Sequence, residues 1–241
     1  MPFVFFDEVH KSFEGKEVLR GLTVLIRKKE MLVILGGSGS GKTVILKHIV
    51  GLLNPDRGRV YLEERPGDGF GEADWLEWRR QIGFLFQNGA LFDSMTVLEN
   101  VAFPLREHTR LSDREIRGRV REKLKLVGLE SVEKMMPDKL SGGMRKRVAL
   151  ARAVILEPQA VLYDEPTTGL DPITCKWVTK LMRGVHEKLN VTSVVVTHNI
   201  QSALSIADRI AFLHRGRIRF LGTPAEIQAS DDRIIQDFLK G

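Results

Sequence analysis

A glycine-rich segment between Gly36 and Thr43 constrains the fold of this chain more than any other feature. It reads Gly-Gly-Ser-Gly-Ser-Gly-Lys-Thr and lies between two apolar stretches, 31–35 and 43–50. The first stretch is apolar throughout, which is typical of a strand buried on both faces, and the second predicts a helix. A strand, a glycine loop and a helix in this order form a phosphate-binding loop. The sequence therefore predicts an α/β fold that binds a nucleoside triphosphate.

The residue types of this loop suit a polyphosphate. Glycines allow successive backbone N–H groups to point into one concavity, and the following helix adds its positive N-terminal end. Lys42 is predicted to place its charge between the outer phosphates, and Thr43 to offer its hydroxyl to Mg²⁺. The alternative is a glycine turn that matches by chance, which the flanking strand and helix disfavour. The predicted phosphate-binding residues are Gly36, Gly37, Ser38, Gly39, Ser40, Gly41, Lys42 and Thr43.

Two carboxylates follow another apolar stretch, 160–163. Asp164 ends this predicted strand, at the edge where parallel sheets bind their ligands, and it can hold Mg²⁺ through water. Glu165 comes next and points elsewhere by strand alternation, so it is placed to orient or deprotonate an attacking water. The alternative is a plain Asp-Glu turn cap before Pro166, which would be favoured if the phosphate loop were missing.

Hydrophobic patterning predicts one domain with strands at both ends of the chain and helices between them. The pattern is helical from 88 to 157, where Ser112 and Glu115 have capping-box spacing and Ser141 is a second helix cap. We therefore expect a strand-rich core, 1–87 and 158–241, and a helical subdomain, 88–157. The predicted core strands are 3–9, 22–26, 31–35, 59–62, 82–86, 160–163, 193–196, 209–213 and 217–220, with a helix at 172–189.

Length and composition exclude several classes of protein. The 241 residues suffice for one large α/β domain, and no apolar stretch approaches the roughly 20 residues that cross a bilayer. A single cysteine, Cys175, excludes an internal disulfide framework and fits a reducing cytoplasm. The net charge is +6, with small basic clusters at 27–29 and 145–147. Solvated surface is the favoured interpretation of these clusters, and proximity to a membrane the second.

A second motif, Leu140-Ser141-Gly142-Gly143-Met144, precedes the two carboxylates. The pairing of LSGG with the phosphate loop resembles the ABC-type ATPase family over essentially the whole chain. The resemblance implies a RecA-like P-loop core with an antiparallel β edge and a helical insertion, the ABC nucleotide-binding domain. In that family the LSGG residues bind the nucleotide held by a partner subunit. A homodimer that encloses two Mg-ATP is therefore expected, with Ser141, Gly142 and Gly143 facing the partner's ATP.

The resemblance also gives roles to single residues that are weak signals alone. Gln87 matches the Q-loop glutamine, a ligand of Mg²⁺ or of the attacking water, and His198 matches the switch histidine that bonds the γ-phosphate. Phe13 stands where the family stacks an aromatic ring on adenine, and Asp171 belongs to the D-loop. The alternatives are a surface glutamine, a structural histidine and a buried turn phenylalanine, the last being equally favoured. The expected catalytic residues are Glu165, His198 and Gln87, and the expected metal ligands are Thr43, Gln87 and Asp164.

Four short segments look like the ATPase subunit of Mla/Mce-type lipid transporters, namely 88–92, 103–109, 144–147 and 170–174. Met144 stands where many ABC ATPases have Gln, whereas the segment 167–170 has the general ABC form. This likeness implies an ATP-hydrolysing subunit on the cytoplasmic face of the inner membrane, with separate permease subunits and a Mce-domain component. Its cargo would be phospholipid or another lipid moved between the inner and outer membranes.

Other functions remain open. Within transport, the alternatives are the ATPase of a polar-solute importer and that of a lipoprotein-release system. A soluble ABC ATPase that acts on DNA or ribosomes is less favoured, because such proteins usually carry tandem domains, coiled coils or long inserts. We therefore expect no nucleic-acid partner.

Overall fold

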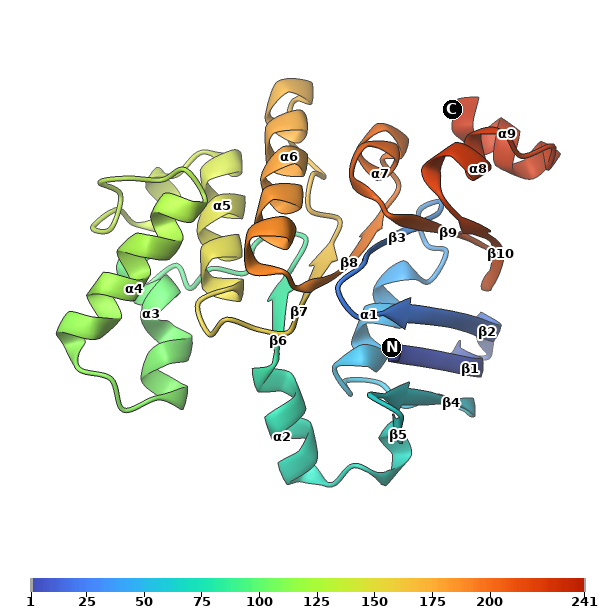
Figure 1. Cartoon of the computed structure of the whole chain (residues 1–241), viewed down its shortest axis with the longest axis horizontal. Helices are drawn as coiled ribbons and strands as arrows, with labels where there is room; N and C mark the ends of the chain where they lie inside the picture. The colour runs from blue at the N-terminus through green and yellow to red at the C-terminus, as the bar shows by residue number, and fades with distance from the viewer. Residues whose placement is uncertain (1, 241) are drawn as a thin grey trace. The chain divides into compact units, whose positions relative to one another are not determined.

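The computed structural model describes residues 2–240, which separate into two compact units. Unit 1 extends as far as Arg79 and resumes at Thr192, and unit 2 extends from Arg80 to Val191. In Figure 1 the colour follows the residue number from blue to red, so each unit can be found by its residue ranges. Unit 2 therefore contains the predicted helical subdomain, 88–157, together with strands and a helix that flank it. The predicted subdomain boundaries themselves stay a prediction.

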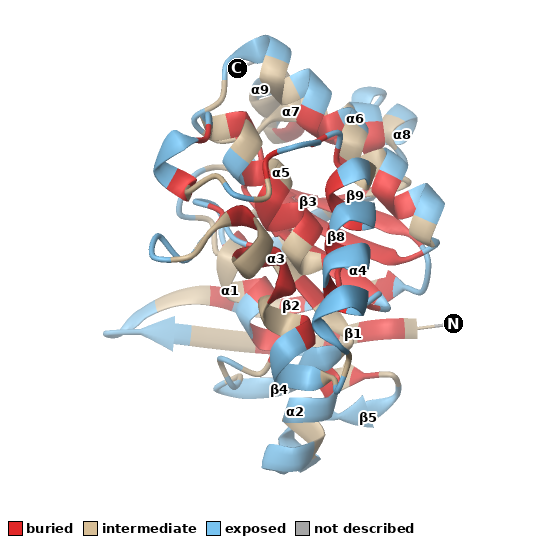
Figure 2. Cartoon of the chain, turned by 90° about the vertical axis from the view of Figure 1, so that its left-hand side faces the viewer, coloured by how far each residue is buried: buried red, intermediate tan, exposed pale blue. Residues whose placement is uncertain are grey.

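Unit 1 contains the parallel strands that carry the glycine loop. They are β3 (Met31–Leu35), β8 (Thr192–Thr197) and β9 (Arg209–His214), with β3 between the other two. Strand β10 (Arg217–Gly222) pairs antiparallel with β9. Every residue of β3 and β8 is buried (Figure 2), which explains why both read as continuous apolar runs. The helices of this part of unit 1 are α1 (Lys42–Ile49), α7 (Ile200–Ile206), α8 (Pro224–Gln228) and α9 (Arg233–Lys240).

A second sheet in unit 1 is antiparallel, with the strand order β2-β1-β4-β5 (Figure 1). Its first two strands form a hairpin whose turn is Glu14-Gly15, and both turn residues have positive φ, 48° and 78°. Tight hairpin turns of this hand need such angles. The predicted antiparallel β edge is confirmed. The elements here are β1 (Pro2–Phe13), β2 (Lys16–Arg27), β4 (Arg57–Leu62), β5 (Arg65–Pro66), the 3₁₀ turn η1 (Gly67–Gly69) and α2 (Glu72–Arg80).

Unit 2 combines two parallel strands with a group of helices. Strands β6 (Ile82–Leu85) and β7 (Ala160–Asp164) pair with each other. The capping box predicted at Ser112 and Glu115 is present at the start of α4, and α3 begins with a second one, Thr96 with Glu99. The helices are α3 (Val97–His108), α4 (Asp113–Leu126), the 3₁₀ turn η2 (Pro137–Lys139), α5 (Gly142–Ala153) and α6 (Pro172–Leu189). The predicted helical character of this region is confirmed.

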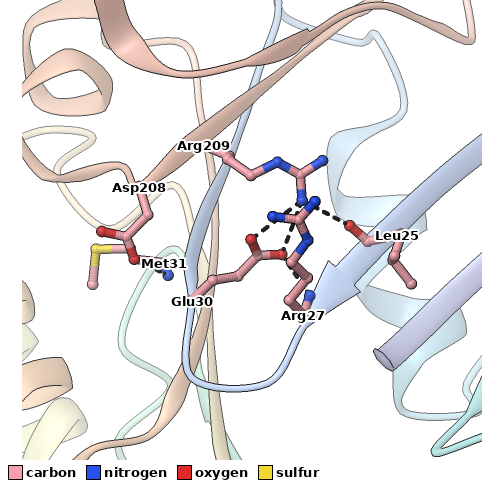
Figure 3. A network of polar contacts seen from close by, with 6 residues as sticks. All are labelled: Leu25, Arg27, Glu30, Met31, Asp208 and Arg209. Carbon is pink, nitrogen blue, oxygen red and sulfur yellow. Dashed lines mark hydrogen bonds and ion pairs between the residues drawn. The ribbon is translucent and has the colours of Figure 1, made fainter. Parts of the chain in front are cut away.

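A buried polar network fixes the start of β3 (Figure 3). Glu30 is only 7% exposed. Its carboxylate accepts one hydrogen bond from the backbone N–H of Arg27 at 2.5 Å and another from Nη1 of Arg209 at 3.2 Å. The backbone N–H of Met31 donates to Oδ2 of Asp208 at 2.7 Å. These bonds join the end of β2 and the start of β9 to β3. Because the glycine loop leaves the other end of β3, this network also fixes the position from which the loop begins.

Within residues 2–240, no helix combines the length and the apolar character that crossing a membrane requires.

Candidate functional site

The glycine loop of unit 1 connects β3 directly to α1. The N–H of Gly36 donates to the carbonyl oxygen of Thr197, at the end of the neighbouring strand β8, at 3.3 Å. Gly39 and Gly41 have φ of 71° and 102°, in the range that glycine alone adopts freely. Gly41 is also the N-cap of α1 and has no side chain to bond the first turn of that helix. The first N–H groups of α1 therefore suit an external anion.

Two glycines of the loop are required because its backbone packs tightly. A Cβ atom on Gly36 would lie 2.6 Å from the carbonyl oxygen of Leu213 in β9. A Cβ atom on Gly41 would lie 2.9 Å from Cγ1 of Val18 in β2. A Cβ atom on Gly37, in contrast, would meet nothing within 4 Å. The loop is therefore held close to β9 and β2 at both ends and is open between them.

The polar side chains of the loop are arranged for an anionic ligand. Lys42 is 6% exposed, and its Nζ donates to the carbonyl oxygens of Gly36 and Gly37, both at 2.9 Å. Oγ of Ser40 is buried and has no hydrogen-bond partner within residues 2–240. A buried hydroxyl without a partner costs free energy, and a ligand with acceptor oxygens would remove that cost. These residues fit a polyphosphate.

Two further predicted residues of unit 1 lie at strand ends. His198 follows β8 and is exposed. Its neighbour Asn199 donates its N–H to Oγ1 of Thr197 at 3.0 Å and caps α7 through the N–H of Ser202 at 2.9 Å. The backbone on the C-terminal side of His198 is therefore fixed. Phe13 ends β1 and is 40% exposed, so the buried-turn alternative is wrong, while stacking on adenine stays a prediction.

The two carboxylates lie in unit 2, at the end of β7. Asp164 is 7% exposed and Glu165 is 9% exposed. Glu165 has φ of 45°, a left-handed conformation that a non-glycine residue seldom adopts. Oγ1 of Thr168 donates to Oε2 of Glu165 at 3.3 Å. The direction of Glu165 is thus set by this backbone turn, whereas the sequence prediction relied on strand alternation. Strained positions of this kind cluster at functional sites.

The LSGG motif and the predicted D-loop are packed together within unit 2. Oγ of Ser141 accepts from the N–H of Met144 at 3.2 Å and caps α5, as predicted. Asp171 caps α6, with Oδ1 accepting from two backbone N–H groups at 3.0 Å. A Cβ atom on Gly143 would lie 2.7 Å from Cγ2 of Thr174. Only glycine therefore allows this approach of α5 to the first turn of α6.

A cavity of about 550 Å³ in unit 2 brings several predicted residues to one place. Gln87, which is exposed, lines it together with Gly142 and Gly169. Arg145 and Lys146 line it as well, and sequence analysis gave them no role in the site. Gln87, one glycine of the LSGG motif (Gly142) and two D-loop residues (Gly169 and Leu170) thus border a common space, whereas Ser141, Gly143 and Asp171 are not among the residues that line it. The loop 36–43, Phe13 and His198 belong to unit 1, and Asp164 and Glu165 to unit 2.

Lys146 corrects one sequence prediction. The basic cluster 145–147 was expected to be solvated surface, but Lys146 is only 7% exposed, and its Nζ donates to the carbonyl oxygen of Gln87. Burial lowers the pKa of the Lys146 ammonium, while the charges of Asp164 and Glu165 act in the opposite direction. The helical period contains a signal for this burial. Lys146 comes three residues after Gly143 and four before Leu150, which are both buried on the same helix.

The predicted metal ligands are compatible with Mg²⁺ bound together with a phosphate. Residues 2–240 contain no group of three or more His, Cys, Asp or Glu side chains that could hold a metal ion alone. Thr43, Gln87 and Asp164 offer a hydroxyl, an amide and one carboxylate, which are the hard oxygen ligands that Mg²⁺ prefers. Mg²⁺ often takes only one or two carboxylates and completes its shell with substrate phosphates and water. This donor set fits that mode of binding.

Comparison with known proteins gives consistent matches. The family model described as ABC transporter matches residues 19–168. The probable ribonucleotide transport ATP-binding protein mkl of Mycobacterium tuberculosis is 42% identical over 231 residues, covering 96% of this chain. The present chain spans only 64% of the length of that relative. The intermembrane phospholipid transport system ATP-binding protein MlaF of Haemophilus influenzae is 40% identical over 220 residues, covering 91% of this chain and 83% of MlaF.

A solved structure agrees with these relatives. It is a dimeric ATP-binding cassette described as a post-hydrolysis state bound to ADP and Pi, and it matches this chain with a TM-score of 0.83 and 34% identity. The match covers 92% of the present chain and 98% of the solved one.

Proposed function

This chain belongs to the ABC transporter family, and from this premise we propose that it binds and hydrolyses ATP to energise a transporter. The observation that carries the proposal is the loop between β3 and α1. It combines a helix start without a side-chain cap, a buried Lys42 and the unpartnered hydroxyl of Ser40. A nucleoside triphosphate supplies acceptor oxygens for the helix start and for Ser40, and a negative charge for Lys42. The structural relative described with ADP and Pi supports the same function.

The roles of the residues follow from their chemistry. Lys42 would exchange the carbonyl oxygens of Gly36 and Gly37 for phosphate oxygens, which carry more negative charge. Glu165 would accept a proton from the attacking water at its carboxylate. His198 would bond the outermost phosphate. Thr43, Gln87 and Asp164 would hold Mg²⁺, which neutralises charge that develops on the phosphate oxygens.

Base binding and the partner surface complete the proposed site. Phe13 would stack on adenine, because its exposed ring ends β1 beside the hairpin turn. Ser141, Gly142, Gly143 and Asp171 would face the nucleotide held by a second copy of the chain. The solved relative described as dimeric supports such a homodimer. In the proposed cycle, ATP closes the dimer and hydrolysis reopens it.

The hydrolysis proposal is tested by measuring phosphate release from ATP by the purified chain, with and without Mg²⁺. We expect slow, Mg²⁺-dependent turnover that rises when a permease is present. Turnover that does not depend on Mg²⁺ would argue against the proposed metal ligands. Absence of any turnover with the permease present would contradict the ATPase proposal.

We propose further that the cargo is phospholipid or another lipid, carried with separate permease subunits and a Mce-domain component at the cytoplasmic face of the inner membrane. This chain covers 83% of the length of the relative that is named for intermembrane phospholipid transport. The relative named for ribonucleotide transport is spanned to only 64%, so its name is the weaker guide. The name of the ribonucleotide transport relative nevertheless favours one alternative, namely that this chain serves a polar-solute transporter.

Isolation of the intact complex distinguishes the two cargoes. The lipid proposal predicts that a permease and a Mce-type component co-purify with the chain, and that extracted phospholipid accompanies them. A complex that contains a polar-solute permease and no Mce-type component would overturn the lipid assignment. The ATPase assignment would be unaffected by that result.

A further inference from the structure

One carboxylate holds the end of strand β1. Asp56, in the loop between α1 and β4, accepts from Nζ of Lys11 at Oδ1 and from the backbone N–H of Ser12 at Oδ2, both at 2.6 Å. The backbone N–H of Asp56 donates to the carbonyl oxygen of His10 at 2.8 Å. Three consecutive residues of β1 are therefore bonded to a single residue of that loop. These bonds fix the strand immediately before Phe13, its last residue.

The lysine in this network also lies over the ring of Phe13. The Nζ atom of Lys11 is 5.7 Å from the centre of that ring, which is within the range of a cation–π interaction. The side chain of Lys11 is only 16% exposed, whereas Phe13 is 40% exposed. The ring therefore has a cation against one face and still presents surface to solvent.

The hairpin that carries Phe13 also packs against the glycine loop. Val18 lies on β2, just beyond the hairpin turn, and a Cβ atom on Gly41 would lie 2.9 Å from its Cγ1 atom. All of these residues belong to unit 1. The segment with the exposed ring is thus in contact with the segment that is predicted to bind the phosphates, as a single nucleotide ligand requires.

A cation on one face of an aromatic ring favours stacking on the other face. The faces of aromatic rings carry negative charge, so stacked rings repel each other there. An ammonium group attracts the π electrons toward itself and weakens that repulsion on the far side. This effect requires a fixed ammonium group, whereas a free lysine side chain is flexible. The hydrogen bonds from Lys11 and from the N–H of Ser12 lower the pKa of the Asp56 carboxyl, so this carboxylate stays charged at neutral pH and restrains the lysine.

We propose that Lys11 and Asp56 are positioning residues for the base of the nucleotide. Asp56 holds the ammonium group of Lys11 on one face of Phe13, and the base stacks on the opposite face. This inference rests on the nucleotide binding proposed above and adds two residues to it, neither of which has a role at the phosphates. Affinity for the base should depend on these two residues, and affinity for polyphosphate should not.

The test compares two ligands by calorimetric titration of the full chain, namely ATP and inorganic tripolyphosphate, which has the phosphates without the base. Lys11→Met removes the cation, and Asp56→Asn leaves one acceptor oxygen for two donors. We expect each change to weaken ATP binding by roughly twofold to fivefold, because an exposed cation–π interaction contributes a factor of that size. Tripolyphosphate binding should be unchanged. Lys11→Arg keeps a cation and should retain ATP affinity close to that of the wild-type chain.

Asp74→Asn is the matched control, because Asp74 makes an equivalent set of contacts elsewhere in unit 1. It accepts from Nη2 of Arg65 at 2.8 Å and from the backbone N–H of Gly71 at 3.0 Å. The guanidinium group of Arg65 also lies over an aromatic ring, 4.6 Å from the centre of Phe70. None of these residues is placed in the nucleotide site, so Asp74→Asn should change the affinity for neither ligand.

Three results would overturn the inference. The first is wild-type ATP affinity in Lys11→Met or Asp56→Asn. The second is an equal loss of affinity for ATP and tripolyphosphate, which would mean that the change disturbs the glycine loop or the fold. The third is a comparable loss of ATP affinity in Asp74→Asn. Exposed ion pairs contribute little to stability, so the variants should remain folded, and retained tripolyphosphate binding shows that they are.

Phe13→Ala tests the proposed function separately. It should weaken ATP binding at least as much as Lys11→Met does. If Phe13→Ala leaves the preference for ATP over tripolyphosphate intact, the proposed base site fails, and this inference fails with it. If Phe13→Ala loses that preference while Lys11→Met and Asp56→Asn keep it, only this inference fails.

Discussion

The glycines of the loop 36–41 serve different purposes at the residue scale. Gly36 and Gly41 allow the backbone to approach Leu213 and Val18 closely. Gly39 and Gly41 adopt positive φ. Gly37 has no close neighbour on the side where a Cβ atom would lie, and its φ is not positive. A phosphate-loop pattern in a sequence does not distinguish these purposes, because every glycine in it reads alike.

We therefore predict opposite outcomes for two neighbouring substitutions. Gly36→Ala should destabilise the chain by about 1–3 kcal/mol, because its Cβ would meet a backbone oxygen that cannot move freely. Gly37→Ala should change stability little, since its Cβ would enter open space. Denaturant unfolding without nucleotide measures both. Equal stability of the two variants would contradict the packing described for the loop.

The proposed general base gives a second prediction at this scale. Glu165→Gln keeps the size of the side chain and one acceptor oxygen but cannot accept a proton at neutral pH. It should bind Mg-ATP with wild-type affinity while kcat falls by about a hundredfold or more. The variant should also accumulate as an ATP-bound dimer, which size-exclusion chromatography detects. Wild-type turnover would show that another residue is the base.

At the scale of single elements, helix starts position the proposed functional groups. Ser141 begins α5, Asp171 begins α6 and Asn199 begins α7, each through a side-chain oxygen that accepts from the first turn. Such caps stabilise a helix and fix where it begins. Ser141 and Asp171 are themselves proposed to face the partner's nucleotide. A substitution there removes a cap as well as a functional group, and an experiment has to separate the two effects.

Two substitutions at Ser141 make that separation. Both Ser141→Ala and Ser141→Arg lose the cap, which should cost about 1 kcal/mol of stability. Only the arginine would fill the surface that meets the partner's phosphate. We expect ATP binding in both variants, reduced turnover in Ser141→Ala and no turnover in Ser141→Arg. Similar turnover in the two variants would mean that Ser141 acts only as a cap.

At the scale of the whole molecule, the sequence predicted regular elements well and local exceptions poorly. Strand β3 has the predicted bounds because a continuous apolar run defines it. Helix α6 also has the predicted bounds, because it begins at the Asp171-Pro172 pair and ends at Asn190, which adopts a left-handed conformation. The short helices α7 and α8 were not predicted, since five to seven residues show too little periodicity. Helix α9 was missed although its apolar residues Ile234, Ile235, Phe238 and Leu239 recur at helical spacing.

The site was predicted in its residue types but not in its local geometry. The exposed ring of Phe13, the left-handed backbone of Glu165 and the burial of Lys146 depend on tertiary packing that no local pattern shows. Pro104 lies inside α3, although proline usually ends a helix. The assignment of the nucleotide-binding and catalytic residues stays a prediction.

One exposed aromatic side chain suggests where a permease would bind this protein. Phe92 is 41% exposed, and its ring centroid lies 5.0 Å from that of Phe103 on α3. Val97 and Val101, on the same helix as Phe103, are fully buried and belong to the core of unit 2. We expect the permease to contact Phe92, because an exposed aromatic side chain backed by the half-buried Phe103 favours a protein partner.

Phe92→Glu should therefore lose the co-purifying permease and the stimulation of turnover, while ATP binding is retained. Leu221→Glu is a matched control, since Leu221 has a similar exposure of 38% but lies on β10. Loss of the permease in both variants, or in neither, would argue against this contact. Pull-down with tagged permease provides the measurement.

The central claim is that the loop between Gly36 and Thr43 binds the nucleotide that the chain hydrolyses. Calorimetric titration of ATP into the wild-type chain and into Lys42→Ala tests it most directly. The account predicts saturable binding by the wild-type chain and none by the variant, because the phosphates lose the cation of the buried Lys42. Both proteins should be equally folded by circular dichroism. Equal ATP affinity in the two proteins would contradict it.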